Sequence, residues 1–436
     1  MRVCFIHASY YPVKGQLSKG NKAWIHGVTL PLLAGCVDPR HSVAIINDSV
    51  HSLPNKNDFD VFFVSMMGSA LDRVKEIAAE LKTASNYIIV GGKPFNETAD
   101  LIVDFVDSVV LGEAEALIPQ ILADIENNDV KKHYGSRDLR TDIAHLPVPR
   151  YDLIDPKKHS NMYPVEATRG CPNDCTFCYI AAWSKKQFRK RPIAEVIRDM
   201  RVLKNMGIKK MLFVDDCLFA DREYALALFA QMKELKMQWV CQITAQAIID
   251  EELITAAAGC GLFAVTIGFE SMSAKNLASV HKRNDPALYA KGIRILHSLK
   301  ILTFPMFVIG FEDQIISELA LITDFCLEHK VTAPLMYILT PPVGTPLYDD
   351  YALRGKLEDN DLSHYNLFHV VFKHEDMTKE ELANCFWTTY RNLYSYRNIY
   401  KRVFCRKMPF ITRCISLGIN LLLHRNTWQQ RQLQLK

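Results

Sequence analysis

Short, unbroken apolar runs alternate with stretches of helical periodicity, and this alternation constrains the fold more than any other feature. The first series of such runs covers residues 3–6, 43–46, 61–64, 87–90 and 108–111. Apolar residues at helical spacing lie between them over 70–82, and again near 114–127. Apolar runs without polar alternation are typical of parallel strands covered on both faces. We therefore expect residues 1–145 to form a doubly wound α/β domain of about five strands, with ligands at the strands' carboxyl ends.

A second alternating series follows a proline-punctuated linker at 145–150. Its predicted strands are 165–168, 211–214, 239–243, 264–267, 303–309 and 335–339. Helices are predicted over 193–206 and 251–258. Six strand–helix units favour a partial (β/α)6 TIM-type barrel over residues 160–350, with its active site at the C-terminal mouth of the strands.

Residues 351–436 are predicted to be helical, and they end in a strongly basic segment. The formal net charge of +4 is uneven, because residues 391–436 contain ten Lys or Arg and no Asp or Glu. Three interpretations are open. A helix packed on the barrel with solvated cations is favoured, an amphipathic helix on anionic lipid comes second, and contact with nucleic acid comes last.

Targeting signals and membrane spans are not evident in the sequence. No apolar run reaches the ~18–20 residues of a membrane span, and the N-terminus lacks the pattern of a secretory signal. We therefore expect a cytoplasmic protein, with peripheral contact at the inner membrane surface if the basic segment binds lipid. Most of the twelve cysteines are scattered singly and are expected to be small buried hydrophobic residues.

The exception is a group of three cysteines, Cys171, Cys175 and Cys178, which directly follows the first strand of the second series. Three thiolates on one loop can hold three irons of a [4Fe–4S] cluster and leave the fourth iron open. Structural zinc normally needs a fourth ligand, and none lies nearby in the sequence. A cluster is therefore favoured over zinc. Cys217, Cys241 and Cys260 are more readily explained by core packing than as auxiliary ligands or hydrogen donors.

The spacing Cys-x3-Cys-x-aromatic-Cys, with Phe177 as the aromatic residue and Tyr179 after the last cysteine, resembles the radical S-adenosylmethionine (SAM) superfamily. The resemblance implies that the open iron chelates the amino and carboxylate groups of SAM. One electron, supplied by a reductant such as flavodoxin or ferredoxin, then cleaves SAM to a 5′-deoxyadenosyl radical.

Three further segments resemble SAM-binding segments of this superfamily. They contain Asp215 and Asp216 after the second strand, Glu270 and Ser271 after the fourth, and Gly310 after the fifth. Strand-end acids are often merely solvated, and a strand-end glycine can simply permit close packing. The fifth-strand loop also departs from the usual pattern, because Glu312-Asp313 stands where a Pro-Gly or Asp-Gly pair is common.

The N-terminal domain resembles the Rossmann-like, cobalamin-binding domains of some radical SAM enzymes. The matching residues are Ser65, Gly91, Gly92, Gly112 and Glu113. The loop after the first strand lacks the Asp-x-His-x-x-Gly segment that supplies a lower axial histidine. This departure implies cobalt without a protein histidine, or a domain that has lost cobalamin, although His7 and His26 remain candidate contacts.

The resemblance implies a cobalamin-dependent methyltransferase that acts on an unactivated centre of a small-molecule or lipid substrate. Radical cyclisation or rearrangement without methyl transfer is an alternative. A tRNA methylthiotransferase is disfavoured because it needs three N-terminal cysteines, and only Cys4 and Cys36 are present. A non-catalytic scaffold is disfavoured because the three-cysteine motif is intact.

Overall fold

The computed structural model describes residues 1–12, 15–92, 98–404 and 409–434, with side chains described up to Arg425. The chain divides into two compact units. Unit 1 comprises 1–167, 189–214 and 361–366, and unit 2 comprises 168–188, 215–360 and 367–436. The three domains proposed from the sequence, 1–145, 160–350 and 351–436, remain predictions.

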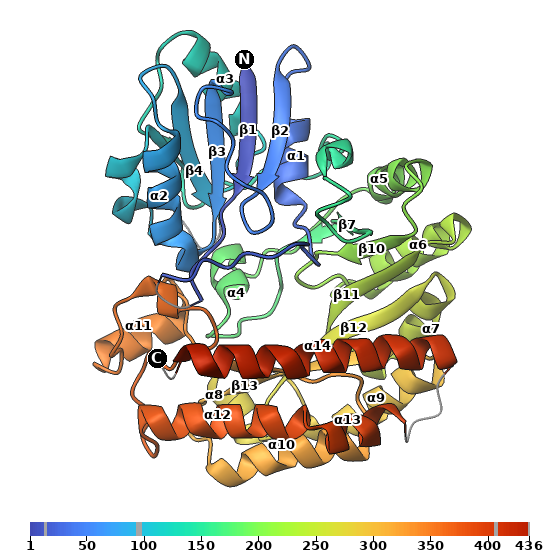
Figure 1. The fold of residues 1–436 in the computed structure, drawn as a ribbon. Helices are drawn as coiled ribbons and strands as arrows, with labels where there is room; N and C mark the ends of the chain where they lie inside the picture. Colours follow the sequence, from blue (N-terminus) through green and yellow to red (C-terminus); the bar gives the residue numbers. More distant parts are fainter. Residues whose placement is uncertain (13–14, 93–97, 405–408, 435–436) are drawn as a thin grey trace. The chain divides into compact units, whose positions relative to one another are not determined.

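The first sheet belongs to unit 1 and has six parallel strands in the order β2-β1-β3-β4-β5-β6 (Figure 1). The strands are β1 (Arg2–His7), β2 (Ser42–Asn47), β3 (Val61–Met66), β4 (Tyr87–Gly92), β5 (Ser108–Leu111) and β6 (His133–Gly135). The first five match the predicted runs. β6 was missed because it has three residues, of which Tyr134 alone is buried.

Helices cover both faces of this sheet, which explains why its strands are unbroken apolar runs. On β1, Val3 and Phe5 pack in one hydrophobic cluster with α1 (Thr29–Gly35) and α3 (Leu117–Glu126). Cys4 and Ile6 pack in the other cluster, with α2 (Leu71–Leu81). Because successive strand residues point to opposite faces, the two clusters lie on opposite sides of the sheet.

The second sheet is also parallel, with six strands in the order β14-β13-β12-β11-β10-β7. The strands are β7 (Met162–Val165), β10 (Lys210–Phe213), β11 (Gln238–Thr244), β12 (Leu262–Glu270), β13 (Leu302–Ile309) and β14 (Leu335–Ile338). This arrangement confirms the expected parallel half-barrel sheet.

The predicted first barrel strand is present, but its predicted bounds, 165–168, were wrong. β7 ends at Val165, and Thr168–Arg169 forms a separate short strand, β8, paired with β9 (Arg189–Lys190). The backbone N–H and hydroxyl of Thr168 both donate to the Asp215 carboxylate. The backbone N–H of Thr168 is therefore used in a hydrogen bond to a side chain and does not extend the backbone hydrogen bonding of β7.

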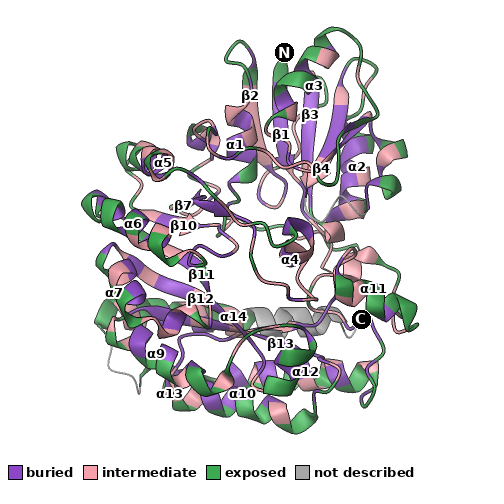
Figure 2. Ribbon diagram, turned by 180° about the vertical axis from the view of Figure 1, so that it is seen from behind, coloured by how far each residue is buried: buried purple, intermediate pink, exposed green. Residues whose placement is uncertain are grey.

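Helices accompany the second sheet, each with an exposed and a buried side (Figure 2). Those preceding residue 340 are α4 (Tyr179–Ser184), α5 (Ile193–Asn205), α6 (Arg222–Met232), α7 (Glu251–Gly259), α8 (Ala274–Ser279), α9 (Tyr289–Ser298) and α10 (Ile316–Glu328). α5 and α7 end within one residue of the predicted boundaries. The helical C-terminal region is also confirmed, by α11 (Pro346–Leu353), α12 (Lys379–Leu393), α13 (Tyr396–Val403) and α14 (Phe410–Gln434).

Gly92, at the end of β4, is required by the backbone itself. Its φ is +146°, and an added Cβ would lie 2.1 Å from the Met66 carbonyl oxygen on β3. We predict that Gly92→Ala lowers the free energy of unfolding by about 2–4 kcal/mol, because strand β3 cannot move away without breaking its ladder. Denaturant unfolding of the isolated chain measures this loss.

Gly259→Ala is the matched control, because nothing lies within 4 Å of a Cβ at this helical position. It should change stability by no more than about 1 kcal/mol, in the stabilising direction. Equal effects of the two substitutions would contradict the backbone explanation.

Candidate active site

The three cysteines of the motif lie on one loop between β8 and α4, and all three are free thiols. The Cys178 N–H donates to the Cys175 carbonyl at 3.1 Å. Thr176, within that turn, is hydrogen-bonded through both of its backbone groups. Its N–H donates to the Val280 carbonyl and its carbonyl accepts from the Leu347 N–H, both at 3.1 Å. Backbone hydrogen bonds therefore fix the conformation of the cysteine loop.

The two acids after β10 hold the beginning of this loop. The Thr168 hydroxyl donates to Asp215 Oδ1 at 2.7 Å, and the Gly170 N–H donates to Asp216 Oδ2 at 3.2 Å. Gly170 has φ +87°, and an added Cβ would lie 2.2 Å from the Gln187 carbonyl oxygen, so glycine is required there. Both carboxylates, predicted as SAM contacts, thus serve to position the cysteine loop in this structure.

The environments of the three thiols differ. Hydrogen bonding to the neighbouring Cys217 thiol lowers the pKa of Cys171 to about 6, and Asn173 Nδ2 also contacts Cys171 Sγ at 3.3 Å. Burial raises the pKa of Cys175 to about 11 and raises that of Cys178. Cys217 is buried, as predicted, but its contact with Cys171 was not foreseen, because 46 residues separate them.

Glu270 forms a buried ion pair with Lys282 beside the cysteine loop. Lys282 Nζ lies 2.9 Å from Glu270 Oε1, and both side chains are at most 15% exposed. Burial opposes a charge on Lys282, but Glu270 and the Cys175 and Cys178 thiols outweigh it and raise the pKa of the lysine. Sequence reasoning missed Lys282, because His281-Lys282-Arg283 has the composition of a solvated loop.

The backbone at Glu270 is irregular. Glu270 has φ +65°, and the register between β12 and β13 shifts between Gly268 and Glu270. The amide of Asn284 supports this bulge by donating to the carbonyls of Gly268 (2.8 Å) and Phe269 (3.0 Å). A bulge at a strand end re-aims the side chain that follows it, which here directs Glu270 toward Lys282.

The remaining predicted SAM residues also belong to unit 2. Ser271 is buried, and its hydroxyl accepts from the Ser273 N–H at 3.0 Å. The Gly310 N–H donates to Gln314 Oε1 at 2.7 Å. Phe177 packs edge-on against Phe311, and Tyr179 begins α4.

Polar atoms around Glu270 and the cysteine loop provide a test of whether SAM fits. Among the described residues, Thr176 Oγ1, Asn276 Oδ1 and Asn284 Oδ1 are buried without a hydrogen-bond partner. Buried polar groups normally have partners, so these atoms suit a polar ligand. The amino group and ribose hydroxyls of SAM are donors of the required kind.

No three His, Cys, Asp or Glu side chains within the described ranges are grouped closely enough to hold one metal ion. A [4Fe–4S] cluster differs from such a site, because each thiolate binds a different iron.

The cobalamin-type residues all belong to unit 1. His7, Ser65 and Gly91 are register partners across β1, β3 and β4, so they form a row at the carboxyl edge of the first sheet. Glycine is needed at positions 92 and 112, because each has a positive φ and lies against neighbouring backbone. A Cβ on Gly112 would lie 2.5 Å from the Ser136 carbonyl oxygen.

Glu113 is held by its own chain. Its carboxylate accepts from Arg189 at 2.5 and 3.0 Å and from the Thr141 N–H at 2.7 Å. It therefore anchors the loop that follows β5.

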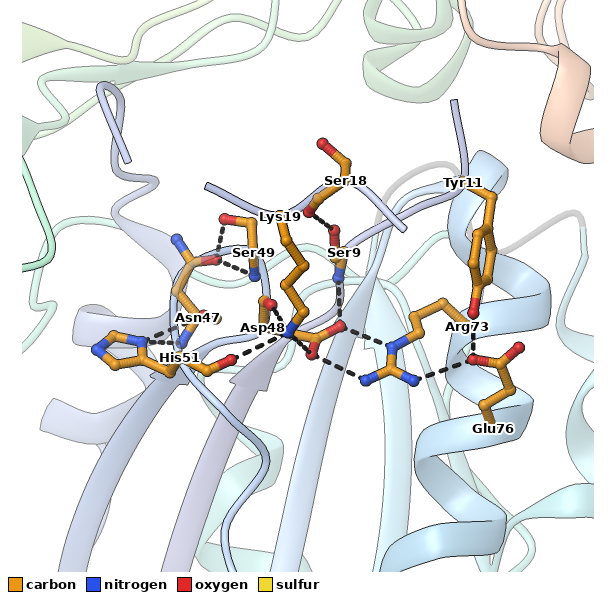
Figure 3. Close-up of polar contacts among 10 residues, drawn as sticks. All are labelled: Ser9, Tyr11, Ser18, Lys19, Asn47, Asp48, Ser49, His51, Arg73 and Glu76. Carbon is orange, nitrogen blue, oxygen red and sulfur yellow. Dashed lines mark hydrogen bonds and ion pairs between the residues drawn. The ribbon is translucent and has the colours of Figure 1, made fainter. Parts of the chain in front are cut away.

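A buried polar network holds the long loop after β1 against the first sheet. Figure 3 shows the Asp48 carboxylate between Arg73 of α2 and Lys19 of this loop. Arg73 donates to both carboxylate oxygens, at 2.8 and 2.9 Å, and Lys19 Nζ lies 2.8 Å from Oδ1. The Ser9 N–H also donates to Asp48, at 3.2 Å. Sequence reasoning missed this network, whose members are far apart in the chain.

The family model of the radical SAM superfamily matches residues 165–325, which include the cysteine loop and the Glu270 bulge. The chain carries a radical SAM domain. A domain of this kind implies SAM and a [4Fe–4S] cluster as cofactors.

Proteins similar to this chain over most of its length include methyltransferases. A bacteriochlorophyllide d C-12(1)-methyltransferase from Chlorobaculum tepidum is 26% identical over 376 residues, which cover 85% of this chain and 81% of the relative. A hopanoid C-2 methylase from Rhodopseudomonas palustris is 21% identical over 347 residues, which cover 76% and 65%.

The fold resembles that of the radical SAM methyltransferase TsrM from Kitasatospora setae, whose structure contains cobalamin and a [4Fe–4S] cluster. The TM-score is 0.72 over 98% of this chain and 99% of TsrM, at 13% sequence identity.

The Asp48 network should stabilise unit 1. We predict that Asp48→Asn lowers the free energy of unfolding by about 1.5–3 kcal/mol near neutral pH, because Arg73 loses its charged hydrogen bonds to Asp48 and keeps only Glu76 as a carboxylate partner. Burial alone would raise the pKa of Asp48, but hydrogen bonds from Arg73 and Lys19 outweigh it and hold this pKa below its ordinary value. The stabilisation is therefore present above pH ~4 and is lost as pH falls through the folded pKa.

Denaturant unfolding of both proteins from pH 7 downward measures the effect, with the exposed pair variant Asp152→Asn as a control. The difference between wild type and Asp48→Asn should narrow below pH ~4. A difference independent of pH would contradict the assigned charge interaction.

The Lys282–Glu270 pair generates a second prediction. Lys282→Met should destabilise the cofactor-free protein by about 3–5 kcal/mol, because Glu270 is left as an uncompensated buried charge. The double variant Lys282→Met with Glu270→Gln should recover most of that loss, since no charge remains. Denaturant unfolding measures the free energy of unfolding of both variants. An equal loss of stability in the single and the double variant would exclude a charge effect.

Proposed function

We propose that the protein is a cobalamin-dependent radical SAM methyltransferase. Cys171, Cys175 and Cys178 hold the [4Fe–4S] cluster in this proposal. The observation that carries it is the cysteine loop itself, whose three free thiols are fixed by backbone hydrogen bonds and by the two acids after β10. When bound, SAM and the cluster supply a 5′-deoxyadenosyl radical, and cobalamin supplies a methyl group.

The residues around the cluster loop bind and orient SAM. Glu270 and Ser271 contact the SAM ribose and amino group, together with the unpartnered oxygens of Thr176, Asn276 and Asn284. Gly310 lies along the adenine, and Phe177, Tyr179, Asp215 and Asp216 complete the surroundings of the cluster loop. Lys282 provides a buried positive charge near the thiols, which favours the anionic thiolates.

Unit 1 is proposed to be the Rossmann-like cobalamin domain. Its strand order, 2-1-3-4-5 with β6 added, is that of a doubly wound sheet that binds ligands at the carboxyl ends of its strands. Ser65, Gly91 and Gly92 line the site at that edge, and Gly112 and Glu113 shape the adjoining loop.

Exposed apolar side chains at the same edge support a large ligand. Trp24 and Ile25, on the loop after β1, are 66% and 68% exposed, and Met67 follows β3 directly. Exposed apolar residues that are grouped can mark a ligand-binding surface, and a corrin macrocycle presents a broad apolar surface that can cover them.

The substrate is proposed to be a small molecule or a lipid, as the names of the methyltransferase relatives indicate. A flavodoxin or ferredoxin is the proposed reductant. Among the described residues no helix is long and apolar enough to cross a membrane. Peripheral contact through the basic C-terminal region remains a prediction of the sequence, and nothing here favours nucleic acid.

Anaerobic reconstitution with iron and sulfide tests the cluster assignment. Wild type should take up about four irons per chain and form 5′-deoxyadenosine from SAM with a reductant. Cys175→Ala should lose 5′-deoxyadenosine formation and the cluster's visible absorption, whereas Cys385→Ala, a half-buried cysteine on α12, should keep both. Cluster absorption or 5′-deoxyadenosine formation in Cys175→Ala would overturn the assignment.

Purification with cobalamin present tests the second cofactor separately. Cobalt should co-elute with the chain in about a one-to-one ratio, as expected for a single cofactor site. Normal SAM cleavage without bound cobalt would instead favour radical cyclisation or rearrangement.

A further inference from the structure

The exposed face of α14 is apolar and its buried face is polar, which reverses the usual arrangement of a surface helix. Ser416 and Asn420 are fully buried, and Asn420 Nδ2 donates to the Thr332 carbonyl at 2.9 Å. The exposed residues between 410 and 422 are uncharged. They are Phe410, Ile411, Cys414, Ile415, Gly418, Leu421 and Leu422, here called the apolar face of α14.

Helical geometry makes this face continuous. At 100° per residue its seven members lie within an arc of roughly 140°, with Ser416 and Asn420 on the opposite side. The apolar face is well exposed, since Phe410 and Ile411 are 77% and 72% accessible. An apolar surface of this kind on a polar-backed helix marks an interaction site.

Helix α13 extends the surface with aromatic side chains. Tyr396, Tyr400 and Phe404 recur at every fourth residue and are all exposed. The Tyr396 ring lies 4.5 Å from the ring of His424, and the Arg413 guanidinium lies 5.9 Å from the ring of Phe404. These contacts, one near each end of α13, show that α13 runs antiparallel to α14.

The charge of this region is wholly positive. Residues 391–436 contain ten Lys or Arg and no acid. Arg402 is buried and donates to the carbonyls of Thr332 and Leu393, so it has a structural role. Arg397 and Arg425 are exposed, and Lys401 and Arg413 are half-buried. Arg391, at the end of α12, is also half-buried, and the remaining four cations, Arg406, Lys407, Arg431 and Lys436, lie outside the residues whose side chains are described.

These observations favour one occupant. A second copy of the chain would bring its exposed Arg397 and Arg425 against those of the first, and like charges repel. An anionic bilayer covers apolar side chains with its acyl boundary and neutralises cations with its headgroups. Tyrosine also suits the interface, where its ring is buried and its hydroxyl stays hydrated.

We propose that α13 and α14 form a peripheral anchor for an anionic membrane surface, with the apolar face of α14 inserted at the headgroup boundary. This inference does not rest on the proposed chemistry, and its test needs no bound cofactor. Its failure would therefore leave the proposed function untouched, and the reverse also holds.

Co-sedimentation of the full chain with lipid vesicles tests the anchor. The chain should bind phosphatidylcholine vesicles that contain roughly a third phosphatidylglycerol at least tenfold more tightly than pure phosphatidylcholine vesicles. Salt on the order of 0.5 M should weaken the binding, because it screens the cations.

Substitutions separate the two components of the anchor. Ile411→Glu with Ile415→Glu should reduce binding to the anionic vesicles at least tenfold, and Arg397→Gln with Lys401→Gln should abolish most of the preference for anionic lipid. Leu353→Glu is the matched control, because Leu353 is 89% exposed at the end of α11 and lies outside the apolar face. All three variants should unfold at the wild-type temperature, since the changed side chains are largely solvent-accessible.

Four results would overturn the proposal. They are absence of wild-type binding, equal binding to neutral and anionic vesicles, unchanged binding by the Ile411/Ile415 variant, and a stable dimer of the free chain that this variant dissociates. The last result would assign the apolar face to contact between two copies.

Discussion

Every strand pair assigned in the two six-stranded sheets is parallel, and both candidate sites depend on that common direction. Parallel strands end at one edge of a sheet, so the loops that follow them meet there. In unit 1 this brings His7, Ser65 and Gly91 into one row. In unit 2 it places the Glu270 bulge and Gly310 at neighbouring strand ends. The chemistry-bearing residues are thus collected by strand direction and not by closeness in sequence.

The cysteine loop is held in place along its length by hydrogen bonds to other parts of the chain. Its beginning is tied to Asp215 and Asp216, its middle is hydrogen-bonded on both sides of Thr176, and Cys178 leads into α4. Two predicted cofactor contacts are therefore also the side chains that fix the loop's position. Lys282 adds a buried positive charge beside this loop, and Glu270 pairs with it in the structure.

In the C-terminal helix α14, packing within the chain does not explain which side chains are exposed. Most helices here bury apolar residues and expose polar ones, as a folded core requires. Helix α14 buries Ser416 and Asn420 and exposes isoleucine and leucine. Places where sequence rules and the fold disagree tend to be functional, because stability within the chain alone would have removed the conflict. The cations and aromatic residues around α14 also indicate a functional surface.

The sequence by itself determined the strands of both sheets other than β6 and the bounds of β7, the helices α2, α3, α5 and α7, and the three-thiol loop, because apolar periodicity and motif spacing are local properties. Only the tertiary structure decided that Lys282 pairs with Glu270, that Cys217 contacts Cys171, and that Asp48 binds Arg73. It also decided that Gly92 and Gly112 are glycines because of neighbouring backbone, and which face of α14 is exposed. Each of these features depends on contacts between segments that are distant in the chain. Such contacts determine which side chains are buried, paired or exposed, and the local sequence does not encode them.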